Sequence, residues 1–143
     1  MLKLMYITNV PEIASIADRA GVDRIFIDLE RYGKEKRQKN WDSVKSKHSI
    51  SDIPKVKASV KNAQIFVRTD PVFDGFADEL EGVLACRPDV VMLPYFKTVR
   101  EVEIFIKAVD GRARTSILLE TREAAELIDD IISVGGIDEI HIG

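Results

Sequence analysis

The segment ILLETREAAELIDDIISVGGIDEIHIG, residues 117–143, indicates the fold of the whole chain. Its apolar beginning, ILLE, and its alternating end, EIHIG, are both typical of buried strands. The stretch between them has a helical pattern and reaches a glycine, Gly135, where a helix is expected to stop. A strand, a helix and a second strand in this order predict a βα repeat with parallel strands.

The same alternation extends back to the N-terminus. Apolar spacings of three and four residues, such as Ile13, Ile16, Ala17 and Ala20, predict one-sided helices between the apolar runs. Thr98 and Glu101 form a capping-box pattern that predicts a helix start. The runs are apolar on both faces, so none of the strands is expected to face solvent. In all we predict five helical stretches and six strands, the strands at 3–8, 24–29, 64–69, 90–95, 115–120 and 139–143.

Composition limits the class of protein. At 143 residues, 45% of them apolar and 31% charged, residues 1–143 are expected to form a single α/β domain. The net charge of −3 lacks the basic surplus that nucleic-acid binding requires. No apolar run approaches the roughly 18 residues of a membrane span. The single cysteine, Cys86, forms no internal disulfide, so we expect a reducing, cytoplasmic setting.

One connection, from Arg31 to His48, is polar and basic. Between residues 34 and 47 six basic residues face two acidic ones, which gives a local charge of +4. This pattern is typical of a solvated surface loop, in which Trp41 serves as an anchor. The alternative is the lip of a site that attracts phosphate or carboxylate groups.

Polar, mostly ionisable residues close most of the predicted apolar runs. The carboxyl ends of parallel strands are where such folds gather their chemistry. Carboxylates facing an arginine suit a divalent cation together with an anionic substrate. Each residue taken singly also fits a structural cap or an ion pair, and His48 and His141 are more typical of hydrogen-bonded structural residues. The strand-end set is Asn9, Asp28, Glu30, Arg68, Asp70, Tyr95, Glu120 and His141.

Four segments resemble the HpcH/HpaI aldolase and citrate lyase β-subunit family, the metal-dependent carbon–carbon lyases of the pyruvate/phosphoenolpyruvate type. They are VPEIASIADRAGVDRIFIDLE (10–30), FVRTDP (66–71), VVMLPYFKT (90–98) and the opening segment at 117–143. Their order and intervals also match, so the resemblance covers essentially the whole chain. It implies a (β/α)8 TIM barrel whose first six strands lie in residues 1–143.

The resemblance also assigns roles to single residues. Glu120 matches the family's first metal-ligating carboxylate, and Arg68 matches the arginine that binds the substrate's carboxylate or carbonyl oxygen. Asp28 and Glu30 match the catalytic acidic pair after strand two, and Pro94 belongs to the strand-four substrate-binding motif. The implied cofactor is Mg²⁺ or Mn²⁺. The implied substrate is a 2-oxo acid or CoA thioester, which a homo-oligomeric, cytoplasmic lyase or aldolase would cleave through a metal-stabilised enolate.

Three features depart from the family pattern. In the family the glycine at the position of Gly143 is followed, after two intervening residues, by an aspartate that is the second metal ligand, and a barrel needs about 250 residues. We therefore expect residues 1–143 alone to be a barrel truncated after strand six and inactive. Arg31 stands where aldolases acting on hydroxy-oxo acids have a histidine, and Tyr95 stands where a lysine is common. The general base is thus not assigned.

Two other classes remain open from the sequence. A flavodoxin-like parallel sheet would fit 143 residues as a binding or signalling module, although TNVPE after the first strand is not a glycine-rich phosphate loop. The other is a non-catalytic barrel remnant that acts through oligomerisation.

Overall fold

The computed structural model describes residues 2–31 and 47–143. All six predicted strands are present; five lie within the predicted segments, and β5 begins one residue earlier than predicted. They are β1 (Met5–Ile7), β2 (Arg24–Asp28), β3 (Gln64–Arg68), β4 (Val90–Leu93), β5 (Arg114–Leu119) and β6 (Glu139–Ile142). The helices are α1 (Pro11–Arg19), α3 (Asp52–Ser59), α4 (Phe76–Ala85), α5 (Val99–Val109), α6 (Arg122–Glu126) and α7 (Ile128–Ser133).

The strands form one parallel sheet in chain order, β1-β2-β3-β4-β5-β6. A flavodoxin-like sheet reverses its strand order at a switch point, so that alternative is wrong. Sequential order is what a barrel wall requires. The sheet curls into a half-barrel with helices outside it, the α/β arrangement of a TIM barrel.

An ion pair inside the sheet shows how strongly it curls. Arg24 on β2 and Glu139 on β6 contact each other through two N–H···O distances of 2.6 Å. In a flat sheet, strands four places apart would be separated by about 19 Å. The rings of Phe66 on β3 and His141 on β6 also lie 5.4 Å apart. The curvature of the sheet therefore brings β2 and β3 into side-chain contact with β6 across the concave face.

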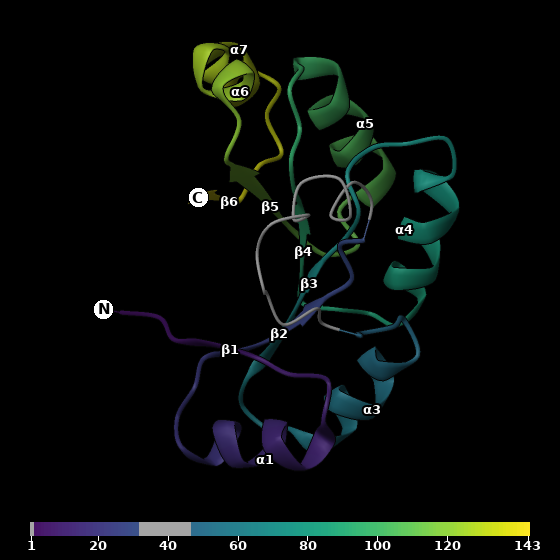
Figure 1. Cartoon of the computed structure of the whole chain (residues 1–143), viewed down its shortest axis with the longest axis vertical. Helices are drawn as coiled ribbons and strands as arrows, with labels where there is room; N and C mark the ends of the chain where they lie inside the picture. The colour runs from purple at the N-terminus through teal and green to yellow at the C-terminus, as the bar shows by residue number, and fades with distance from the viewer. Residues whose placement is uncertain (1, 32–46) are drawn as a thin grey trace, which may run out of the picture.

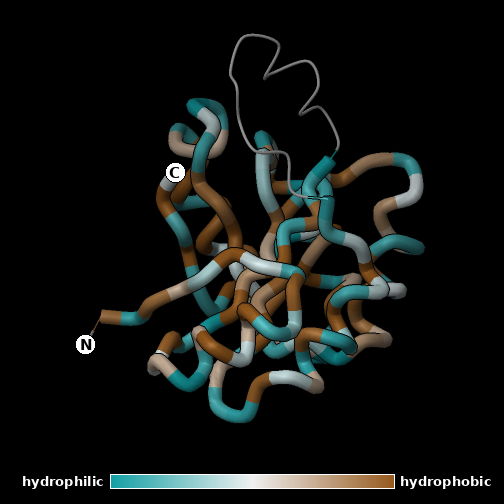
Figure 2. The backbone as a smooth tube through the Cα atoms, turned by 60° about the horizontal axis from the view of Figure 1, so that its bottom comes forward, coloured by the Kyte–Doolittle hydropathy of each residue, from teal (hydrophilic) through white to brown (hydrophobic). Residues whose placement is uncertain are grey.

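The helices pack on the convex face, and both ends of the chain lie on the opposite side of the sheet (Figure 1). Many of the hydrophobic stretches of the backbone lie toward the centre of the molecule (Figure 2). The main core lies between sheet and helices and includes Ile27, Val67, Leu93 and Phe105. A smaller cluster on the concave face has Phe66, Val90 and Met92 at its centre.

Local sequence sets several helix ends. Thr98 and Glu101 form the predicted capping box at the start of α5, with each side chain hydrogen-bonded to the other residue's backbone N–H. The stretch after β5 was expected to form one helix, but it forms α6 and α7, which meet at Leu127 (φ −106°, ψ 15°). Helical periodicity continues through this break because both short helices bury residues on the same side, Ala124 and Ile131.

The two edge strands differ from the expectation that no strand faces solvent. The middle strands are buried, but on β1 Tyr6 and Ile7 are 47% and 53% exposed, and on β6 Ile142 is 85% exposed. The sequence pattern identifies apolar strands but does not say whether a neighbour covers them. None of the helices in the described residues has the length and apolar character needed to cross a membrane.

Candidate active site

An arginine and two carboxylates meet where β2 and β3 end. Asp28 and Arg68 close these strands and are register partners, so their side chains share one face of the sheet. Arg68 Nε and Nη2 donate to the two carboxylate oxygens of Asp28, each at 2.9 Å. Nη2 also lies 3.4 Å from Glu30 Oε2. The sequence-predicted residues Asp28, Glu30 and Arg68 are thus brought together.

This cluster is largely shielded from solvent. The Asp28 and Glu30 side chains are 5% and 4% exposed, and that of Arg68 is 18% exposed. Burial, the largest influence, lowers the pKa of Arg68, but the hydrogen bonds that Arg68 donates to Asp28 and the charges of Asp28, Glu30 and Glu120 outweigh it. The pKa of Arg68 is therefore raised, and its guanidinium stays charged. It lies 5.6 Å from the centre of the Phe26 ring.

Glu120 follows β5 at the same end of the sheet. Its side chain is exposed, and its charge contributes to the raised pKa of Arg68. Glu120 Oε1 accepts a hydrogen bond of 3.0 Å from the backbone N–H of Tyr95. Tyr95 has a left-handed backbone (φ 48°) just after the buried Pro94. The end of β4 therefore orients the Glu120 carboxylate, while substrate binding by Pro94 stays a prediction.

The other strand-end residues have structural partners. Asn9 donates to Asp52 at the start of α3. Asp70 accepts the backbone N–H of Arg31 at 2.6 Å. His141 lies on the concave face, and its Nε2 is 3.8 Å from Glu139. Burial, the largest influence, lowers the pKa of His141 despite the charge of Glu139. These contacts agree with the structural interpretation of the histidine.

Residues 3–143 match the sequence pattern of the HpcH/HpaI aldolase/citrate lyase family. The chain belongs to this family. Its members are aldolases and carbon–carbon lyases, which generally depend on a divalent metal ion. Comparison with curated proteins gave no match.

Solved structures with the same fold are longer than this chain. An HpcH/HpaI aldolase/citrate lyase family protein from Burkholderia cenocepacia J2315 superposes with a TM-score of 0.74 at 12% identity, covering 99% of this chain and 63% of that one. The structure of 2,3-dimethylmalate lyase superposes with a TM-score of 0.61 at 16% identity, covering 96% of this chain and 52% of that one. Oxaloacetate acetylhydrolase bound to its product oxalate superposes with a TM-score of 0.65 at 14% identity, covering 96% of this chain and 51% of that one. At these identities the likeness establishes the fold alone.

The fit to the family's divalent metal can be tested on the side chains. Residues 2–31 and 47–143 contain no group of three histidine, cysteine, aspartate or glutamate side chains that could hold a metal ion. Mg²⁺, however, usually binds through one or two carboxylates together with waters and substrate oxygens. The exposed, oriented carboxylate of Glu120 fits one position of such a shell.

His48 joins the site although its sequence position predicted only a loop or cap residue. The backbone N–H of Asp28 donates to His48 Nδ1 at 2.9 Å, and the His48 side chain is buried. Nδ1 acts as an acceptor here, so the neutral ring carries its proton on Nε2. Arg31 Nη2 donates to the carbonyl oxygen of His48 at 2.7 Å. His48 lies 20 residues beyond Asp28, and no periodic pattern in the sequence could reveal this contact.

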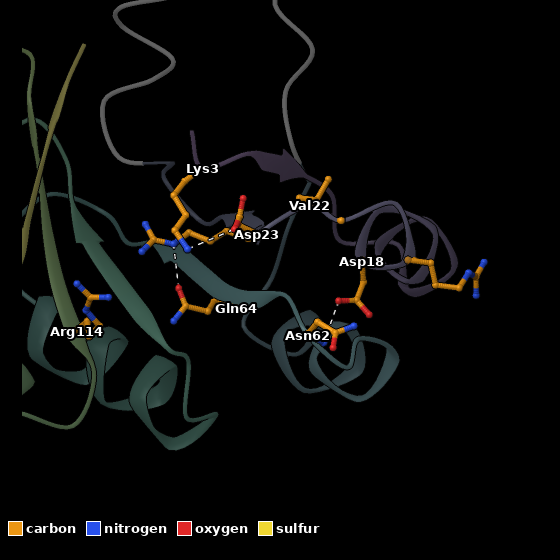
Figure 3. Close-up of a pocket in the computed structure, with 10 residues that line it drawn as sticks. Lys3, Asp18, Val22, Asp23, Asn62, Gln64 and Arg114 are labelled. Carbon is orange, nitrogen blue, oxygen red and sulfur yellow. Dashed lines mark hydrogen bonds and ion pairs between the residues drawn. The ribbon is translucent and has the colours of Figure 1, made fainter. Parts of the chain in front are cut away.

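A cavity of about 610 Å³ lies at the other end of the sheet from the Asp28–Arg68 cluster (Figure 3). Its lining includes Lys3, Asp23, Arg24 and Arg114. Lys3 pairs with Asp23, and both arginines pair with Glu139. These four residues therefore have ionic partners within the protein. The basic segment predicted as a loop or lip, with Trp41 and its basic residues up to Lys45, lies outside the described residues.

Proposed function

We propose that the full-length protein is a metal-dependent carbon–carbon lyase or aldolase that acts on a 2-oxo acid or a related acyl substrate such as a CoA thioester. The observation that carries this proposal is the charged Arg68, held by Asp28 and Glu30 at the strand ends near Glu120. A fixed cation can bind an anionic substrate, and an oriented carboxylate near it can bind a hard metal ion at the same site. Family membership supports this interpretation.

Arg68 would bind the carboxylate or carbonyl oxygen of the substrate and neutralise the oxyanion that develops as the carbon–carbon bond breaks. Its planar guanidinium fixes the substrate's orientation better than a lysine could. Glu120 would hold Mg²⁺ or Mn²⁺, which when bound polarises the carbonyl group and stabilises an enolate. Pro94, which is buried beside Tyr95, would form part of the substrate-binding surface at these strand ends.

Asp28 and Glu30 would act as the acidic pair of the reaction. Both contact Arg68, so they fix the guanidinium, and we propose that they also orient the water that carries the proton to and from the substrate. Arg31 occupies the position of the histidine found in some relatives. Its side chain donates to the His48 carbonyl oxygen, which gives it a structural task.

The experiment is a cleavage assay on the full-length protein. A panel of 4-hydroxy-2-oxo acids is incubated with enzyme and Mg²⁺ or Mn²⁺, and released pyruvate is measured. We expect release that stops when EDTA is added and resumes with excess metal. The exposed Arg122→Ala variant serves as control for Arg68→Lys, and only the latter should be impaired. Release that is insensitive to EDTA, or equal in both variants, would contradict the proposal.

A second candidate is a non-catalytic module that acts by oligomerisation. The exposed apolar residues of β1 and β6 favour it, because such edges pair readily with other chains. Homo-oligomerisation is also compatible with a lyase, so this candidate is distinguished by a protein that assembles but shows no metal-dependent cleavage of any substrate in the panel.

A further inference from the structure

A chain of hydrogen bonds leads away from Asp28 behind the candidate site. His48 accepts the Asp28 backbone N–H, and Arg31 binds the His48 carbonyl oxygen through its side chain. The backbone N–H of Arg31 donates to Asp70 Oδ1 at 2.6 Å. Arg31 therefore links the end of β2 both to His48 and to the loop after β3.

This chain continues to a carboxyl group that the proposed reaction does not use. Glu79, in the first turn of α4, accepts the backbone N–H of Asp70 at 3.1 Å through Oε1. The carboxyl groups of Glu79 and Asp70 are also hydrogen-bonded to each other. Both line a small cavity of about 90 Å³ together with Leu29, Arg31 and Ile50.

Two adjacent carboxyl groups in a partly buried cavity repel each other when both are ionised, which raises the free energy of the doubly charged state. Burial, the largest influence, raises the pKa of Glu79; the hydrogen bond from the Asp70 backbone N–H lowers it, and the charge and side chain of Asp70 raise it. In the described part of the chain, the charged groups facing Glu79 are Asp70 and Arg31, and Arg31 opposes this shift.

We propose that Glu79 is a positioning residue for the candidate site: its carboxyl group accepts the Asp70 backbone N–H and so holds Asp70 where Arg31 and His48 can fix the backbone of Asp28. The inference depends on the site assigned under the proposed function, but its contacts are independent of any substrate. When Glu79 ionises, its charge repels Asp70, and the Arg31 N–H bond should weaken.

The test is NMR on the full-length protein without substrate. Backbone amide signals of Arg31 and Asp28 and the ring nitrogens of His48 are followed between pH 4 and 8. In the wild type both amides should shift with a common midpoint above about 4.3, the ordinary pKa of a glutamate. Glu79→Gln can accept from the Asp70 N–H and donate to its carboxylate, so it should keep the low-pH spectrum and lose the transition.

Two further variants complete the design. Glu79→Ala should displace the Arg31 and Asp28 amide signals and the His48 Nδ1 signal at every pH. Glu81→Gln, an exposed carboxylate on the same helix, should titrate like the wild type. A transition that persists in Glu79→Gln, or its absence in the wild type, would overturn the proposal. If Glu79→Ala does not fold, Glu79→Gln alone decides. These outcomes do not depend on lyase activity, so failure of the proposed function is recognised separately.

Discussion

Arg68 and Asp28 form a buried pair in which two N–H groups meet two carboxylate oxygens at 2.9 Å. Desolvating both charges costs free energy that the pair recovers only through this good geometry. Removing one partner leaves the other buried and uncompensated. Here the loss of Arg68 would leave two such carboxylates, Asp28 and Glu30.

Arg68→Ala should therefore lower the free energy of unfolding by about 3–5 kcal/mol, the typical effect of breaking a buried ion pair. Urea unfolding monitored by circular dichroism measures it in the full-length protein. The matched control is Arg122→Ala, whose ion pair with Glu126 is exposed, and its midpoint should hardly move. An Arg68→Ala midpoint equal to that of the wild type would show that Asp28 and Glu30 need no counterion.

Glu120→Gln keeps the size of the side chain and the oxygen that accepts the Tyr95 N–H, but it removes the charge that a hard cation prefers. Titration of the full-length protein with Mn²⁺, followed by electron paramagnetic resonance, should show clearly weaker binding than in the wild type. Glu126→Gln, an exposed carboxylate on α6, is the control. Equal affinity in Glu120→Gln and the control would place the metal elsewhere.

At the scale of single residues, the sequence identified those that end strands. Asp28, Arg68 and Glu120 could be predicted because a parallel sheet brings the carboxyl ends of its strands to one edge. His48 and Glu79 could not, because their contacts depend on how a loop and a helix pack after folding.

Among the elements, the sheet's curvature depends on contacts between strands that are not neighbours. Arg24 and Glu139 join β2 to β6 across the concave face, and their side chains are 9% and 17% exposed. The hydrogen bond from Arg24, the largest influence, lowers the pKa of Glu139 although burial opposes it. A lowered pKa means that Glu139 stabilises the fold above the pKa of the unfolded chain, and that this stability is lost as pH falls toward the folded-state value.

Glu139→Gln should thus destabilise the protein at neutral pH, by about 3–5 kcal/mol as for other broken buried pairs. The difference from the wild type should shrink as the pH falls below about 4.3, where Glu139 becomes protonated in the unfolded chain and then in the folded one. Urea unfolding of both proteins from pH 7 to pH 3 measures this. Glu103→Gln, in an exposed pair, serves as control. A difference that stays constant with pH would argue against the lowered pKa.

Element positions were largely predictable, since apolar runs and helical spacing both arise from burial against the sheet. Two features were not. The break at Leu127 keeps the same side of the helical segment buried, so the spacing of apolar residues in the sequence does not reveal it. The exposure of β1 and β6 depends on neighbours that a local pattern cannot report.

At the scale of the whole molecule, residues 1–143 form a half-barrel whose two edge strands expose apolar side chains. The sequential strand order follows from βα repetition, but the degree of curling depends on the contacts inside the sheet. The chain spans roughly half to two-thirds of the length of the lyase structures it superposes on.

Residues 1–143 produced alone should self-associate through these edges and show no metal-dependent lyase activity. Light scattering coupled to size-exclusion chromatography should give a mass above that of the monomer. Lysine at Ile7 or Ile142 should reduce the association, whereas Ile16→Lys, on the exposed face of α1, should not. A monomeric and catalytically active product would contradict this account.

The most direct test of the central claim is hydrogen exchange on a 2-oxo acid. Full-length protein and Mg²⁺ are mixed with pyruvate in D₂O, and the loss of the methyl proton signal is followed by NMR. A site that stabilises an enolate should accelerate this loss in a way that EDTA abolishes. Arg68→Lys keeps the charge but loses the planar fork, so it should slow exchange by about tenfold or more, equivalent to one charge-assisted hydrogen bond. Exchange that is absent, independent of metal or unchanged in Arg68→Lys would contradict the assignment of this strand-end cluster as a lyase site.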